Sequence, residues 1–210
     1  NSFILDGLTF NSCEAKYGGA VYIYSSSKLN PVIIRNCVFT NNIAYLTEEN
    51  SQDGKFGGSA IFMTAKKGSI KSNIIGENKG ETTVKIYNHF NEDESNKARK
   101  LDKDFFLISN CQFEISKDES SCLYYLLGNG ASSFELRDCT FKGELSEKAH
   151  YIDGSAVNKY GPKLIVKKCR FAALNSNKAF NLDSINEFMS IDLKDQVFNV
   201  KGTEKISKKS

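Results

Sequence analysis

The feature that most constrains the fold of this chain is a short motif that recurs seven times and ends in a large apolar residue. The clear copies span residues 34–39, 108–113, 136–141 and 166–171, and the weaker copies span residues 5–10, 70–75 and 193–198. Their closing residues follow one another at steps of 27 to 38 residues. A repeat of this length predicts a solenoid in which each copy forms part of one turn.

Each copy carries two apolar residues two positions apart, followed by a residue that suits a sharp bend. Val32 and Ile34 are one such pair, and only the third copy breaks the pattern, with Gly68 before Ile70. Residues spaced by two point to the same side of a strand. The bend positions hold Gly7, Asn36, Ser72, Asn110, Asp138, Lys168 and Asp195. Gly, Asn and Asp tolerate the left-handed backbone conformation, so we expect a bend between two short strands, with Lys168 as the exception.

A second motif lies between copies of the first, at residues 20–23, 60–63, 83–86, 122–125, 156–159 and 179–182. Its second position is always apolar and its fourth is apolar except at Lys159, so we expect these two to face inward and the third to face outward. The outward positions are Tyr22, Phe62, Lys85, Tyr124, Asn158 and Asn181.

Together the two motifs predict three short strands per turn, with parallel pairing between turns about 4.8 Å apart. The fold class is therefore all-β, a right-handed parallel β-helix of about seven turns. The hand is assumed from the right-handed preference of parallel crossovers. A β-sandwich fits less well because hairpin turn pairs are scarce and a sandwich has no reason to repeat near this length. A leucine-rich solenoid would need Leu and Asn at regular positions in each repeat, and this pattern is absent.

We expect a single β-helical segment over residues 1–200, followed by a basic, flexible tail at 201–210. Polar insertions near 47–55 and 88–104 account for the two longest steps of the repeat, and we expect both to be loops. Solvated surface is the usual role of such insertions, and a recognition loop is the alternative. Strand material begins at once and neither end offers an obvious cap, so the sequence favours a segment of a longer protein.

Charge and hydropathy exclude two classes of partner. The net charge is +3 with both signs dispersed, so no nucleic-acid partner is expected. No apolar run approaches the length of a membrane span, so we expect no membrane insertion by this segment.

Four of the six cysteines, Cys37, Cys111, Cys139 and Cys169, share one column of the repeat. One interpretation is a stack of buried, reduced side chains. The other is a disulfide between neighbouring turns, such as Cys139 with Cys169, although in-register side chains rarely reach the required dihedral angle. Closely spaced cysteine pairs are absent, so the sequence predicts neither a zinc site nor a cofactor.

Two short stretches resemble a known repeat. Residues 18–21 (GGAV) and 39–42 (FTNN) resemble the paired GGAI and FxxN motifs of the polymorphic outer membrane protein repeat, and residues 57–61 (GGSAI) are a stretched version of the first. After Phe10, Phe113, Phe141 and Phe171 the Asn is replaced. The resemblance implies a pectin-lyase-like right-handed β-helix, a location at the cell surface or outside the cell, and a role in adhesion.

No catalytic constellation is visible in the sequence. The outward positions hold no carboxylate pair for acid and base work, and Asp153 and Asp183 flank that face on different turns. The only histidines, His89 and His150, fall in expected loops. The outward residues, Tyr22, Phe62, Lys85, Tyr124, Asn158 and Asn181, are instead the candidate ligand-binding set, since exposed aromatics can stack on sugar rings or meet a protein. The alternative is that the inserted loops cover this face.

Three hypotheses follow. The first is a non-catalytic β-helical segment of a cell-surface or secreted protein that presents an elongated face to a carbohydrate or to a surface protein of a host or neighbouring cell. The second is a polysaccharide lyase or glycoside hydrolase whose active site is incomplete in this segment. The third is a purely structural rod or spacer, which a covered aromatic face would favour.

Overall fold

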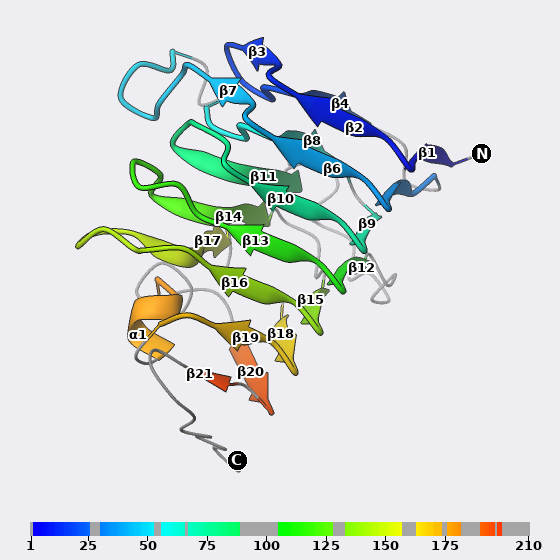
Figure 1. The fold of residues 1–210 in the computed structure, drawn as a ribbon. Helices are drawn as coiled ribbons and strands as arrows, with labels where there is room; N and C mark the ends of the chain where they lie inside the picture. The colour runs from blue at the N-terminus through cyan, green and yellow to red at the C-terminus, as the bar shows by residue number, and fades with distance from the viewer. Residues whose placement is uncertain are drawn as a thin grey trace.

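The computed structural model describes residues 2–25, 30–52, 56–65, 67–88, 105–127, 133–156, 163–173, 176–181, 190–195 and 197–198, and over these ranges the chain forms a parallel β-helix (Figure 1). The strands stack turn upon turn, and strands far apart in the sequence lie side by side in parallel. This is the all-β solenoid that the repeat predicts.

Three sheets run along the solenoid, and among the described residues the first two hold seven strands each and the third holds five. The first holds β1 (Phe3–Asp6), β5 (Val32–Arg35), β9 (Gly68–Lys71), β12 (Phe105–Ser109), β15 (Ser133–Arg137), β18 (Lys163–Lys167) and β20 (Ser190–Lys194). The second holds β2 (Thr9–Asn11), β6 (Val38–Thr40), β10 (Ile74–Gly76), β13 (Gln112–Glu114), β16 (Thr140–Lys142), β19 (Arg170–Phe171) and β21 (Val197–Phe198). The third holds β4 (Val21–Tyr24), β8 (Ile61–Thr64), β11 (Thr82–Asn88), β14 (Ser121–Leu127) and β17 (His150–Ala156).

Two minor elements complete the described fold. A small two-stranded sheet pairs β3 (Glu14–Ala15) with β7 (Ile43–Ala44), and a short helix, α1 (Ser176–Ala179), lies against β17. No helix among the described residues has the length and apolar character needed to cross a membrane.

The bends between the first two sheets confirm the sequence prediction at all seven positions. Their φ angles are positive and range from 52° at Lys168 and Asp195 to 68° at Gly7. A lysine in this conformation carries the steric cost that Gly avoids and that Asn and Asp reduce. Lys168 is therefore the strained bend that its side chain predicts.

The core is made of inward columns that stack from turn to turn. The closing aromatic residues lie face to face, with ring centroids 4.7 Å apart for Phe113 and Phe141 and 4.9 Å apart for Phe141 and Phe171. The break in the pattern at Gly68 also has a packing reason. A Cβ there would lie 2.7 Å from the ring of Phe106 in the next turn, so the large ring fills the space that an apolar side chain would occupy.

The cysteine column is a stack of buried thiols and contains no disulfide. Each thiol donates to the carbonyl oxygen two residues earlier, as Cys37 does to Arg35 at 3.1 Å and Cys139 does to Arg137 at 3.3 Å. Where the third turn has Asn73 in this column, its side chain accepts a hydrogen bond from the backbone N–H of Cys37 at 2.7 Å. The column is therefore structural, as the first interpretation of the cysteines predicted.

The motif asparagines form a second buried ladder. The Asn42 backbone N–H donates to Oδ1 of Asn78 at 3.0 Å, and Nδ2 of Asn78 donates to the carbonyl oxygens of Phe39 at 3.1 Å and Gly76 at 2.9 Å. Both asparagines are fully buried. The asparagine of the FxxN motif thus binds the backbone of neighbouring turns, which explains its place in the sequence without a ligand.

One copy of the second motif was assigned to the wrong residues. In β17, Ile152 pairs with Leu123 and Asp153 pairs with Tyr124, so the fifth copy is 151–154 rather than 156–159. The misassignment arose because the first position, small in most other copies, is here Tyr151. This ring is buried, and its hydroxyl lies 3.1 Å from the carbonyl oxygen of Ala172.

The described part of the first insertion, residues 47–52, lies outside the strands and contains a turn, as expected of a loop. Residues 89–104 and the tail at 201–210 lie outside the described residues, so the predictions for the second insertion and the tail stay predictions.

Candidate functional site

The predicted outward residues form a continuous row across the third sheet. Tyr22 pairs with Phe62, Phe62 with Lys85, and Lys85 with Tyr124. Asp153 follows Tyr124 in register, and Asn181 lies directly after the bridge that joins Phe180 to Ile152. Tyr22, Phe62, Lys85 and Tyr124 thus lie in the row as expected, and Asn181 lies at its end. Asn158 lies outside the described residues, and Asp153 takes the place in the row that was expected for it. We call this row and the rings packed on it the aromatic face.

The middle of the aromatic face is covered by the chain itself. Phe62 and Lys85 are each 1% exposed. The ring of Tyr17, in the turn before β4, packs on Tyr22 and Phe62 with centroids 5.2 and 5.6 Å apart. Phe56, directly after the first insertion, packs edge-on against Tyr124, with ring centroids 6.0 Å apart. The centre of the row is therefore covered, although by Tyr17 and Phe56, which lie outside the two insertions that were expected to cover it.

Lys85 lies in an aromatic box formed by Phe56 and by its two neighbours on the sheet, Phe62 and Tyr124. Its Nζ is 2.9 Å from the ring centroid of Phe56, 4.9 Å from that of Tyr124 and 5.8 Å from that of Phe62. A cation over an aromatic face is stabilised by the negative charge density of the ring. This contact fastens the end of the insertion to the sheet.

Burial dominates the electrostatics of this box. It lowers the pKa of Lys85 to about 7, although the nearby carboxylates of Glu81 and Glu48 act to raise it. Burial also raises the pKa of Glu81 above its ordinary value. Lys85 thus has the low pKa of an activated amine, but its side chain does not reach solvent and so is not accessible to a substrate.

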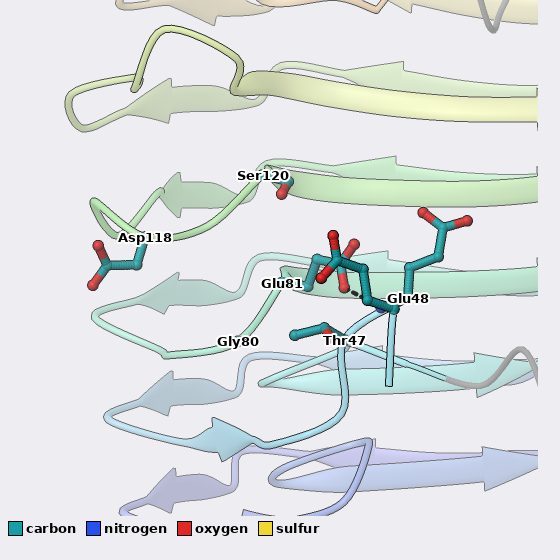
Figure 2. Close-up of a pocket in the computed structure, with 7 residues that line it drawn as sticks. Thr47, Glu48, Gly80, Glu81, Asp118 and Ser120 are labelled. Carbon is teal, nitrogen blue, oxygen red and sulfur yellow. Dashed lines mark hydrogen bonds between the residues drawn. The ribbon is translucent and has the colours of Figure 1, made fainter. Parts of the chain in front are cut away.

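An acidic cleft of about 490 Å³ opens beside the covered centre. It is lined by Thr47, Glu48, Glu49, Gly80, Glu81, Asp118 and Ser120, which come from three different turns. Figure 2 shows Glu48 and Glu81 together, joined by the hydrogen bond that the Glu48 backbone N–H donates to the Glu81 carboxylate, while the Asp118 carboxylate points away from them. Within the described ranges, no three acidic, His or Cys side chains gather closely enough to hold a metal ion.

Glu119, between the cleft residues Asp118 and Ser120 in sequence, is buried and serves the fold. It accepts hydrogen bonds from the hydroxyls of Ser59 at 3.0 Å and Thr83 at 2.8 Å, and from the Ser116 backbone N–H at 3.0 Å. Burial raises the pKa of Glu119 to about 7, against the effect of these three donors. Because the donors belong to three turns, this carboxylate ties the turns together.

Accessible side chains lie at the two ends of the aromatic face, and Tyr124, beside the covered centre, is half-buried. At the amino-terminal end Tyr22 is 42% and Tyr24 is 65% exposed. At the other end Asp153 and Asn181 are half-buried, and the hydrogen bond from Asn181 opposes the burial that raises the pKa of Asp153. A ligand can therefore reach two tyrosines at one end or a carboxylate and an amide at the other.

Sequence reasoning missed several residues that shape this surface. Phe56 and Tyr17 belong to no copy of the repeat, and Asp153 was placed outside the row by the misassigned fifth copy. An isolated aromatic residue at the end of a polar insertion was the available signal for Phe56. The cleft residues carried no comparable signal, because they are brought together from segments up to 73 residues apart in the sequence.

Comparison with known proteins adds no relative. No family model, no curated protein and no solved structure matches this chain.

Proposed function

We propose that this chain is a non-catalytic β-helical segment of a cell-surface or secreted protein. The observation that carries the proposal is the state of Lys85, the one basic residue of the predicted ligand-binding row. Its side chain is buried beneath Phe56 and makes cation–π contacts with aromatic rings. It therefore helps to hold the covering segment on the sheet and is not available for chemistry on a substrate.

The location of the protein is inferred from the resemblance of its motifs to the polymorphic outer membrane protein repeat. The structure gives the glycine and asparagine of those motifs a role in the turns. Gly18 and Gly58 adopt φ angles of 63° and 66°, and a Cβ on either would lie within 2.8 Å of a backbone oxygen. The motifs are therefore explained by β-helix geometry, and the surface location and the pectin-lyase-like relationship are carried by the resemblance alone.

The binding role is assigned to the amino-terminal end of the aromatic face. Tyr22 and Tyr24 are two positions apart on β4, so both side chains leave the sheet on its outer side. Exposed tyrosines offer an apolar ring and a polar hydroxyl, the combination that suits sugars and protein partners. A carbohydrate or a surface protein of a host or neighbouring cell is the partner class we propose.

The test is retention of the chain on a panel of immobilised neutral polysaccharides, with release of soluble sugar measured in the same samples. We expect retention without release, lost in the double variant Tyr22→Ala, Tyr24→Ala. The matched control is Tyr45→Ala, since Tyr45 is also 55% exposed but bonds to Glu14 outside the row. Retention that is lost equally in both variants would contradict the assignment, and absence of retention would favour the spacer.

A polysaccharide lyase or glycoside hydrolase is the second candidate, and the acidic cleft is the observation that favours it. Glu48 and Glu81 lie together there, and a carboxyl group whose pKa is raised can act as a general acid. Release of oligosaccharide that is abolished by Glu81→Gln would establish this candidate and overturn the non-catalytic proposal.

A further inference from the structure

The aromatic box around Lys85 has the form of a cation-binding site. Two of its walls are the rings of Phe62 and Tyr124, which pair with Lys85 in register from the neighbouring strands. Phe56 forms the roof. The Lys85 Nζ lies 2.9 Å from the centroid of the roof ring and 4.9 and 5.8 Å from those of the Tyr124 and Phe62 rings. All three distances fall within the range of about 6 Å over which a ring attracts a cation.

The rings of the box are also held by contacts that do not involve Lys85. Phe62 packs on Tyr22 and Tyr17, with ring centroids 5.4 and 5.6 Å apart. Phe56 packs edge-on against Tyr124, with centroids 6.0 Å apart. The walls and the roof therefore support one another without the lysine, and a ligand meets a site whose geometry is already set.

The acidic cleft beside the box attracts cations to it. Among the residues that line the cleft, none carries a positive charge and four carry a carboxylate, namely Glu48, Glu49, Glu81 and Asp118. Glu81 and Glu48 are also the carboxylates whose charge acts on Lys85. A cleft lined by charges of one sign raises the local concentration of the opposite ion. An organic cation is therefore drawn to the edge of the box.

Lys85 is a poor occupant of a site of this kind. Burial lowers its pKa to about 7 against the effect of Glu81 and Glu48, so near neutral pH its amine is uncharged for about half of the time. A neutral amine loses the attraction that a ring exerts on a cation, whereas a quaternary ammonium keeps its charge at every pH. The flexible four-carbon stem of Lys85 starts on the outer side of the sheet, so it can turn from the box towards the two carboxylates.

We propose that the aromatic box is a binding site for a small quaternary ammonium compound, which displaces Lys85 from between the rings towards Glu48 and Glu81. The displaced ammonium then neutralises part of the cleft, and the ligand takes its place over the rings. The ligand has to be small and free, because Phe56 covers the box and is itself only 6% exposed, a depth that a headgroup held in a membrane surface does not reach. This inference concerns the covered centre of the aromatic face and does not rest on the proposed function, which is assigned to its exposed end.

The test is isothermal titration calorimetry of the unaltered chain with choline and with dimethylbutanol, the neutral analogue in which carbon replaces the nitrogen. We expect choline to bind and the analogue not to bind, because the rings attract only the cation. Lys85 regains its ordinary pKa of 10.5 when it leaves the box, so choline binding should take up about one proton per ligand between about pH 8 and 9.5. The affinity should therefore fall about tenfold for each unit that the pH rises in this range. Titrations in buffers of different ionisation enthalpy measure the proton uptake.

Lys85→Ala empties the box. This variant should bind choline about tenfold more tightly than the unaltered chain, or better, and without dependence on pH, because no lysine has to be displaced. Addition of Phe56→Leu should weaken that binding about tenfold, since the roof loses its ring. Lys148→Ala is the matched control, because it removes the same charge from an exposed turn and should leave the affinity for choline unchanged.

Equal binding of choline and dimethylbutanol would overturn the site, as would failure of the unaltered chain to bind choline. Choline binding without proton uptake, or a folded Lys85→Ala variant that binds no more tightly, would show that the ligand does not displace Lys85. Urea unfolding shows whether each variant keeps its fold. If Lys85→Ala does not fold, the comparison of choline with its analogue and the proton uptake of the unaltered chain still decide the question. Binding to phosphatidylcholine vesicles with equal affinity would overturn the choice of a small free ligand.

Discussion

The buried asparagine ladder gives the sharpest prediction about stability, which concerns Asn78→Ala. The Asn78 side chain accepts hydrogen bonds from the backbone N–H of Asn42 at 3.0 Å and from its Nδ2 at 2.9 Å, and it donates to two carbonyl oxygens. All of these atoms lie in the turns and not at the surface, since Asn42 and Asn78 are both fully buried. Removal of the amide therefore leaves buried groups without partners.

The size of the loss in stability follows from the hydrogen bonds that each buried group retains in the variant. Nδ2 of Asn42 retains a bond to the Phe10 carbonyl oxygen at 3.2 Å, whereas the structure gives its backbone N–H no bond besides the one to Asn78. A buried donor without a partner costs about 1 to 3 kcal/mol, and the bonds lost at the two carbonyl oxygens add about 1 kcal/mol. We expect Asn78→Ala to lower the free energy of unfolding by about 3 kcal/mol.

The assay is urea unfolding followed by circular dichroism, with Asn11→Ala as the matched control. Asn11 bonds to Ser12, Thr40 and Asn41 in a similar way, but its side chain is exposed, so its removal should cost no more than about 0.5 kcal/mol. Equal costs for the two variants would refute the argument that the motif asparagines hold the turns together by satisfying buried backbone groups.

Four further predictions test other parts of the fold. Stability should fall as pH rises from about 4.5 to 7, because Glu119 keeps its proton to about pH 7 in the folded state but releases it near pH 4.5 in the unfolded state. Glu119→Gln should therefore flatten the dependence of the urea midpoint on pH, and an unchanged dependence would show that Glu119 is not its source. Stability should rise again between about pH 7 and 10.5, because the pKa of Lys85 is about 7 in the folded state and 10.5 in the unfolded chain. Lys85→Met should remove this rise, and a rise that persists in the variant would show that another group is responsible. A thiol reagent should modify the half-exposed Cys13 in the folded protein and should reach the five buried cysteines only after unfolding. Cys111 should be especially unreactive, because hydrogen bonding to Cys139 and burial raise the pKa of its thiol. Rapid modification of more than one thiol in the native protein would contradict the buried stack. Lys168→Asn should raise the free energy of unfolding by about 0.5 to 1 kcal/mol, because Asn tolerates the positive φ of this bend better than Lys; a loss of stability would show that the lysine side chain makes a compensating contact.

The sequence by itself determined the solenoid. Its inward columns, the positive φ at each bend and the cysteine stack follow from rules that act within a few residues: alternation along a strand, and the few residue types that suit a left-handed bend. These rules repeat with every turn, so an error in one copy does not spread to the others. The fifth copy of the second motif was predicted wrongly because Tyr151 stands where a small residue was expected, and the true register is set by pairing of Ile152 with Leu123 in the preceding turn.

Only the tertiary structure decided what covers the outer side of the third sheet. Lys85 and Phe62 occupy outward positions, yet both are buried, because Phe56 and Tyr17 fold back over them from segments that the repeat does not govern. The acidic cleft has the same origin, since its residues meet only when three turns are stacked. Local periodicity tells which side of a strand a residue faces, but whether that side meets water depends on where a distant segment packs.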